Sequence, residues 1–328
     1  MELRKLKGIY RKTFISISIS LAVIILFQFL NSFRLDLKMF LSFKFLFGVF
    51  ILIAIYIIDA IRLKLLLHFF GYNVLIRETA RNIIFGKFFS FITPMSIGGQ
   101  PYQIYHLSKI GVKTEDATNI IISRTLEISF VILLLDVIFV RLILNAYPKS
   151  FGFGLIITGL LISLSISILI FLGFVNRKFL EKILIFFNRF LKNKQEKEKI
   201  LEWIDSLQGS IKVLWLKNPW MLIFDTFLYF LTVCMYSYIM FLLVKNTINF
   251  WYLVGIMALL NSVAYYIPTP GSSGGIESTY QIVFTQIFGG AKAIETVMIF
   301  RIITFYIPLI LSTILFPKFG INYNKEEG

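Results

Sequence analysis

Long apolar runs separated by short basic segments make up most of the chain. A helix needs about 20 apolar residues to cross roughly 30 Å of hydrocarbon. Runs near this length occur at 14–30, 45–67, 117–140, 155–175, 221–244 and 294–316. The pattern predicts an all-α polytopic membrane protein with about six transmembrane helices. We expect one membrane domain over residues 1–328, with the first run kept as an uncleaved helix, because no small-residue cleavage site follows it.

The composition supports a lipid solvent and excludes several functional classes. Hydrophobic residues make up 57% of the chain and charged residues 16%, a balance that is not typical of water-soluble domains. The net charge of +15 comes from Lys and Arg beside the apolar runs, which indicates membrane topology and contact with anionic headgroups rather than nucleic acid. One cysteine, two histidines and the lack of a phosphate-binding glycine loop predict no metal and no cofactor.

A seven-residue pattern, TPxSxGG, occurs twice, as TPMSIGG at 93–99 and TPGSSGG at 269–275. Each copy follows a short apolar segment and precedes a short helical one, and each is later followed by a long run with one arginine. The residues expected at the two tips are Thr93, Pro94, Ser96, Gly98 and Gly99 in the first copy, and Thr269, Pro270, Gly271, Gly274 and Gly275 in the second. The repetition predicts two related halves, at about 44–141 and 220–316.

Each copy of the pattern predicts a break between two helices. Proline removes a backbone donor and glycine favours turn geometry, so a straight helix cannot continue through either motif. Because the flanking segments are short, we expect two re-entrant helical hairpins, whose broken backbone must be buried in protein or line a polar cavity. The alternative is a simple loop between two helices at the membrane surface.

The distribution of Lys and Arg predicts the orientation of these elements. Basic residues near span ends face the cytoplasm, which predicts that both termini lie on the cytoplasmic side of the cell membrane. The two hairpins then enter from opposite faces, an inverted-topology repeat typical of transporters whose sites lie near the midplane. Residues 176–219 combine many Lys with apolar residues at helical spacing, and they predict a cytoplasmic amphipathic linker hairpin on the inner leaflet.

Buried charges supply the candidate site residues. An arginine in the middle of a span costs roughly 2.5 to 3.5 kcal/mol, so Arg124 and Arg301 need partners or water. Spacing suggests pairs of Arg124 with Glu127 and of Arg62 with Asp59. Arg301 needs a distant partner, for which Glu277, Glu295 or a lipid phosphate would serve. Asp136 and Asp225 are expected near span ends, with their carboxylates reaching toward the headgroups.

The hairpin tips also predict an anion site. Helices that begin near Gly98 and Gly274 would direct unpaired amides and positive dipole ends toward a phosphate. Further contacts to a headgroup are expected from Gln100, Gln103, Tyr102 and Tyr105. For the two tyrosines an interfacial aromatic belt is an equally good interpretation. Glu127 and Glu277 are candidate carriers of a proton or cation.

The two motifs carry a family resemblance. TP at 93–94 with GGQP at 98–101, followed by PTPG at 268–271 with Gly274 and Glu277, resembles flippase-like membrane proteins related to the transmembrane half of lysylphosphatidylglycerol synthases. The resemblance covers roughly residues 21–316. It implies that the chain moves a lipid headgroup between leaflets. In the synthases an aminoacyl-transferase domain follows, whereas this chain ends at Gly328, so we expect no synthase activity.

We therefore expect a lipid translocase of the cell membrane, with membrane lipids as ligands and with Arg124 and Arg301 holding the phosphate. Many relatives carry an acidic residue where this chain has Gln100, so a glycolipid or ordinary phospholipid fits at least as well as a cationic headgroup. Two other functions stay open: a membrane-embedded transferase that uses a lipid-linked donor, and a scaffold for a separate soluble or membrane lipid-modifying enzyme. A homodimer also stays open.

Overall fold

A computed structural model describes residues 42–146, 218–244, 248–264 and 269–320, together with isolated residues elsewhere. The described residues form helices and turns, and no strand occurs among them, which confirms the expected all-α class. The expected spans at 14–30 and 155–175 and the linker at 176–219 lie outside these four ranges, apart from isolated residues and the last two residues of the linker.

Three helical segments of the described chain are long and apolar enough to cross a membrane. They are α2 (Phe43–Phe69), α9 (Pro219–Leu243) and a continuous segment that comprises α12 (Gly290–Arg301), the π-helical turn η3 (Ile302–Tyr306) and α13 (Ile307–Phe319). They coincide with the expected runs at 45–67, 221–244 and 294–316. The run at 117–140 lies in α5 (Thr114–Ala146), a helix of 33 residues that carries Arg124, Glu127 and Asp136 within that run.

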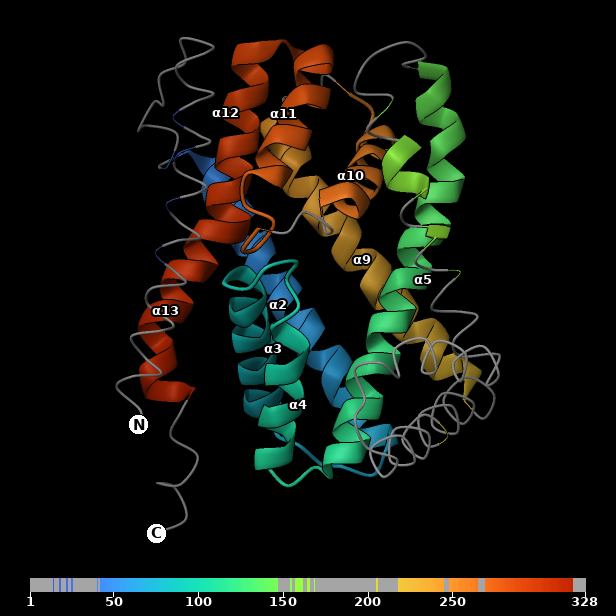
Figure 1. The fold of residues 1–328 in the computed structure, drawn as a ribbon, viewed down its shortest axis with the longest axis vertical. Helices are drawn as coiled ribbons and strands as arrows, with labels where there is room; N and C mark the ends of the chain where they lie inside the picture. The colour runs from blue at the N-terminus through green and yellow to red at the C-terminus, as the bar shows by residue number, and fades with distance from the viewer. Residues whose placement is uncertain are drawn as a thin grey trace, which may run out of the picture.

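Two pairs of shorter helices contain the repeated motifs. They are α3 (Ile76–Phe91) with α4 (Gly99–Lys109), and α10 (Phe250–Ala264) with α11 (Gly275–Phe288). With 11 to 16 residues each, at about 1.5 Å per residue, they are shorter than the hydrocarbon layer of roughly 30 Å. In Figure 1 the α3–α4 pair occupies the lower half of the molecule and the α10–α11 pair the upper half. The turns of the two pairs face each other at the centre.

The two motifs turn the chain through the same local backbone geometry. In both motifs the third and fourth positions have left-handed φ angles: 54° and 56° at Met95 and Ser96, and 57° and 53° at Gly271 and Ser272. The proline before them fits the first corner of a turn, and each motif closes with a hydrogen bond from its fourth residue to the carbonyl of its threonine, at 3.2 Å and 3.0 Å. The shared backbone path explains why the same residue types recur at the same spacing.

The main hydrophobic core joins α2 and α5 to α9, α10, α11 and α12. Helix α2 packs against α9 and α3, and α5 packs against α10. The α5–α10 contact is close because Gly255 has no side chain and so leaves space for Phe139. A Cβ added at Gly255 would lie 2.5 Å from the Cβ of Phe139. A separate aromatic cluster, which includes Phe88, Phe305 and Phe316, joins α3 to the last membrane segment.

Candidate functional site

The tips of the two helix pairs contact each other. Pro94 and Pro270 form an isolated antiparallel β-bridge, and the amide of Gly271 donates to the carbonyl of Thr93 at 3.3 Å. Pro94 and Pro270, which occupy equivalent positions of the two motifs, therefore lie beside each other. Gly271 also lies against the π-helical turn, since an added Cβ would lie 2.5 Å from Cε2 of Phe305.

The threonines of the motifs hold the tips by different contacts. Thr93 accepts a hydrogen bond from the amide of Gly98 at 2.9 Å and donates to the carbonyl of Phe89 at 2.7 Å. Thr269 instead donates across its own turn to the carbonyl of Ser273 at 2.7 Å. The first tip is the more exposed, whereas residues 271–273 of the second tip are buried. The two copies therefore share a backbone path but not an environment.

A buried ion pair lies at the second tip. Nε of Arg301 is 2.8 Å from Oε1 of Glu277, and Oε2 of Glu277 accepts a hydrogen bond from the amide of Gly274 at 2.8 Å. Arg301 is 4% exposed, and its guanidinium lies 4.1 Å from the ring centre of Phe305. Of the expected partners, the structure brings Glu277 and not Glu295 to Arg301. The amide at this helix start binds a carboxylate of the chain itself, so an anion would have to displace Glu277.

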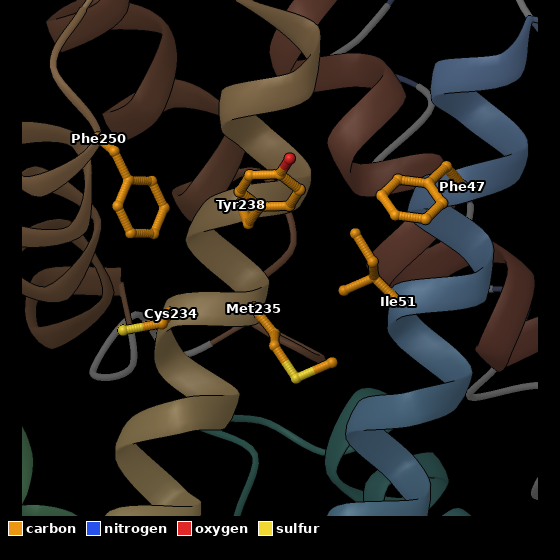
Figure 2. A pocket seen from close by; sticks show the side chains of 6 residues that line it. All are labelled: Phe47, Ile51, Cys234, Met235, Tyr238 and Phe250. Carbon is orange, nitrogen blue, oxygen red and sulfur yellow. The ribbon is translucent and has the colours of Figure 1, made fainter.

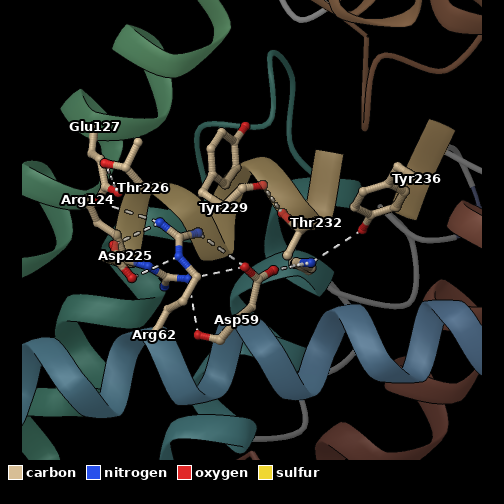
Figure 3. A network of polar contacts seen from close by, with 10 residues as sticks. Asp59, Arg62, Arg124, Glu127, Asp225, Thr226, Tyr229, Thr232 and Tyr236 are labelled. Atoms are coloured by element: carbon tan, nitrogen blue, oxygen red, sulfur yellow. Dashed lines mark hydrogen bonds and ion pairs between the residues drawn. The ribbon is translucent and has the colours of Figure 1, made fainter. Parts of the chain in front are cut away.

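A larger cluster of charges lies between α2, α5 and α9, and Figure 3 shows it. Its centre is Arg62, which is fully buried and contacts both carboxylate oxygens of Asp225 at 2.9 Å. Nη2 of Arg62 also lies 3.5 Å from Glu127. The expectation that Asp136 and Asp225 reach toward the headgroups is wrong, since they are 0% and 1% exposed. The two-pronged contact with Arg62 keeps Asp225 inside the protein.

Arg124 joins this cluster through α2. Its Nη2 atom lies 3.2 Å from the carbonyl oxygen and 3.5 Å from Oδ1 of Asp59. The expected partner on its own helix, Glu127, instead contacts Arg62 and accepts a hydrogen bond from Thr226 at 3.1 Å. Both side chains find closer partners on other helices, because α2 and α9 carry complementary groups that spacing along α5 cannot reveal. The expected contact of Arg62 with Asp59 is present at 3.4 Å.

Lys87 of α3 completes the cluster, and sequence reasoning missed it. Its Nζ lies 2.7 Å from Oδ2 of Asp59 and donates to the hydroxyl of Tyr236 at 3.4 Å. It also lies 4.2 Å from the ring centre of Tyr56. The cluster thus joins three cations, Arg62, Lys87 and Arg124, to three carboxylates, Asp59, Glu127 and Asp225. Its formal net charge is zero when all six side chains are ionised.

A polar stripe on α9 runs beside these charges. Asp225, Tyr229, Thr232 and Tyr236 follow a four-three-four spacing, which places them on one face of the helix (Figure 3). Cζ of Arg62 lies 4.9 Å from the ring centre of Tyr229. The stripe covers about 16 Å of the helix axis. Its four-three-four spacing was the signal in the sequence that could have revealed the site on α9.

Four other expected contacts of a headgroup lie outside the charged cluster. Gln100 is exposed and donates to Thr125 of α5 at 3.0 Å. Gln103 packs between α3 and α4 against Gly86, since a Cβ added at Gly86 would lie 2.7 Å from Cγ of Gln103. Tyr102 stacks on Phe89 with ring centres 4.7 Å apart, and Tyr105 is 54% exposed. These side chains hold the first helix pair together or face outward.

An apolar cavity of about 260 Å³ lies between α2, α9 and the start of α10 (Figure 2). It is lined by Phe47, Ile51, Cys234, Met235, Tyr238 and Phe250. No charged side chain is among these residues, so the cavity is unsuited to a charged headgroup. Across the described ranges, no group of three or more His, Cys, Asp or Glu side chains is arranged to hold a metal ion.

Comparison with known proteins agrees with the resemblance of the two motifs. A UPF0104 membrane protein of Archaeoglobus fulgidus is 24% identical over 286 residues, which cover 83% of this chain and 84% of that protein. The family described as the lysylphosphatidylglycerol synthase TM region matches residues 13–312. The match covers most of the chain, including both helix pairs and every residue of the charged cluster, so this chain is a membrane protein that belongs to that family.

Proposed function

We propose that the protein is a lipid translocase, which moves a phospholipid or lipid-linked headgroup between leaflets through the centre of the molecule. The observation that carries the proposal is the contact of the two tips, Pro94 with Pro270, next to helices that bear buried charges. Two short helix pairs whose tips meet at the centre of the molecule fit re-entrant hairpins in an inverted repeat. Broken backbone of this kind is tolerated at membrane depth where protein or a polar path surrounds it.

The arginines supply donors for a phosphate. Nε of Arg124 and Nη2 of Arg301 are buried and have no hydrogen-bond partner among the described residues. A guanidinium binds phosphate through parallel N–H groups, and burial strengthens that contact. In the proposed cycle a lipid phosphate takes the place of a carboxylate on each arginine in turn. The carboxylates displaced are Asp59 on Arg124 and Glu277 on Arg301. Glu277, or Glu127 in the charged cluster, could take up a proton or cation.

The apolar parts of the structure suit the lipid tails. Outward side chains of α2 and α9, such as Phe50, Ile53 and Phe227, are exposed and apolar, which fits contact with lipid. The tails can therefore remain in the bilayer while the headgroup passes the charged cluster. Since this cycle forms and breaks no covalent bond, we propose a transporter rather than an enzyme. A lipid gradient, the membrane potential or protons would drive it.

The test is leaflet exchange of labelled lipids in vesicles that contain equal amounts of wild type, the double variant Arg124→Gln with Arg301→Gln, and the control Lys64→Gln. Lys64 lies on α2 outside the charged cluster. We expect exchange with wild type and the control, and loss of exchange in the double variant. Thermal unfolding in detergent checks that the variant is folded.

Two other results would contradict parts of the proposal. Normal exchange by the double variant would show that the arginines do not hold the phosphate. Absence of exchange for every lipid with wild type would reject translocation. Co-purification of a lipid-modifying enzyme would then favour a scaffold.

A further inference from the structure

The ammonium group of Lys87 fills a site that is built for a cation. Nζ of Lys87 lies 2.7 Å from the carboxylate of Asp59 and 3.4 Å from the hydroxyl of Tyr236. It also lies 4.2 Å from the ring centre of Tyr56, over the aromatic face. A second ring face, that of Tyr236, lies 5.7 Å from Nζ. Carboxylates and aromatic faces around one point are the groups that recognise a primary ammonium.

The site and the group that occupies it come from different elements. Tyr56 and Asp59 lie on α2 and Tyr236 lies on α9, whereas Lys87 lies on α3, one arm of the first helix pair. Asp59 also contacts Arg62 and Arg124, at 3.4 Å and 3.5 Å. The carboxylate is therefore surrounded by cations of the chain itself, and no acidic group of the cluster is left to neutralise a further one.

We propose that Lys87 determines headgroup specificity: it occupies the cation site, so that the protein accepts anionic phospholipids and rejects headgroups with a net positive charge. The inference rests on the proposed function, which it deepens by naming the substrate class. A cationic headgroup near this site would meet Lys87, Arg62 and Arg124 with their carboxylates already engaged. An anionic phosphate meets the buried N–H groups of Arg124 and Arg301 that have no partner among the described residues. Cationic headgroups are thus rejected by repulsion from Lys87, Arg62 and Arg124. Anionic headgroups are accepted by those N–H groups of Arg124 and Arg301.

The first experiment tests the cation site without transport. Lys87→Ala removes the ammonium and most of its stem, and ethylammonium chloride is then added to the purified variant in detergent. We expect Lys87→Ala to lower Tm and ethylammonium to restore most of the loss in a saturable way, with an equal concentration of sodium chloride as the salt control. The matched control, Lys87→Ala with Asp59→Asn, should show no such recovery, because the carboxylate that attracts the ammonium is gone. A folded Lys87→Ala protein that does not respond to ethylammonium would overturn the inference.

The second experiment tests specificity with two labelled lipids in the same vesicles. One is phosphatidylglycerol, which is anionic, and the other is its lysine ester, which is cationic. We expect wild type to exchange the anionic lipid about tenfold faster or more, a ratio that corresponds to about 1.4 kcal/mol. Lys87→Met, which keeps the length of the side chain and removes its charge, should reduce this ratio to about threefold or less. Lys64→Met should keep the wild-type ratio.

The outcomes separate the two proposals. Protein-dependent exchange of both lipids at equal rates by wild type would overturn the role of Lys87 and leave translocation standing. An unchanged ratio in folded Lys87→Met would also overturn it. Failure of wild type to exchange both of these lipids would overturn the specificity role of Lys87, even if ethylammonium restored the Tm of Lys87→Ala. The translocase itself is rejected only when wild type exchanges no labelled lipid at all.

Discussion

Gly271 and Thr93, which belong to different copies of one motif, are joined by a hydrogen bond of 3.3 Å between their main chains. With the bridge of Pro94 to Pro270 it ties together two helix pairs that are 176 positions apart in sequence, the difference between 94 and 270. The contact uses backbone atoms only, so it depends on the turn geometry of both motifs. A change that moves one tip must therefore break this contact or move the other tip with it.

Replacement of Gly271 should disrupt the tip contact. In Gly271→Ala the new Cβ would lie 2.5 Å from Phe305 and 2.9 Å from the carbonyl of Phe91, at a φ of 57°. We expect its loss of stability to exceed that of a glycine variant with backbone strain alone by about 1–3 kcal/mol, because neither backbone nor ring can easily give way. Thermal unfolding in detergent measures it. Gly111→Ala is the matched control: its φ is 94° but no atom lies within 4 Å, so only the backbone strain of about 1 kcal/mol remains. Equal losses in both variants would contradict the tight contact.

Asp225→Asn should be among the most destabilising single changes in the cluster. It removes the charge that binds Arg62 through two contacts of 2.9 Å and leaves a buried guanidinium without its main partner. Loss of one member of a buried pair typically costs about 3–5 kcal/mol. Glu127→Gln should cost less, since Glu127 lies 3.5 Å from Arg62. Unfolding in urea compares the two variants, and a reversed order would argue against Asp225 as the principal partner.

Glu277 and Arg301 should show strong energetic coupling. Arg301→Gln leaves a buried carboxylate with the Gly274 amide as its remaining contact, whereas Glu277→Gln leaves a buried guanidinium. The double variant leaves neither charge unpaired, so its loss of stability should be smaller than the sum of the two single losses by about 1–3 kcal/mol. A double-mutant cycle from thermal unfolding gives this value. Additive losses would show that the 2.8 Å contact contributes little.

The turn after α2 should give a pH-dependent contribution to stability. The hydroxyl of Tyr72 donates a hydrogen bond to Asp116, and this bond raises the pKa of Tyr72 above its ordinary value of about 10. Because the pKa is raised in the folded state, the stabilisation is fully present below the unfolded-state value and is lost as pH rises through the folded-state value. The difference in Tm between wild type and Tyr72→Phe should therefore be constant up to about pH 9 and shrink at higher pH. Tyr105→Phe, at an exposed position, is the control for removal of a tyrosine hydroxyl.

Part of the candidate site could be predicted from the sequence. Arg301 in a long apolar run required a partner, and Glu277 was one of two acids proposed for it; the structure brings Glu277 to 2.8 Å. The pairing of Arg124 with Glu127 followed from spacing on one helix but did not anticipate the contacts to α2 and α9. The role of Lys87 could not be predicted, because a lysine within a short, moderately polar helix resembles an ordinary surface residue until its neighbours are known.

The sequence by itself determined the helices and the breaks between them, since both depend on local properties. The length of an apolar run sets whether a helix can cross lipid, and Pro with Gly limits the backbone angles of the residues that carry them. Only the tertiary structure decided which charges meet. Arg62 and Asp225 lie 163 positions apart, and the sequence around either residue does not indicate that the other is its partner. Their contact arises because α2 packs against α9, and packing depends on the shape of both helices together rather than on the sequence around either one.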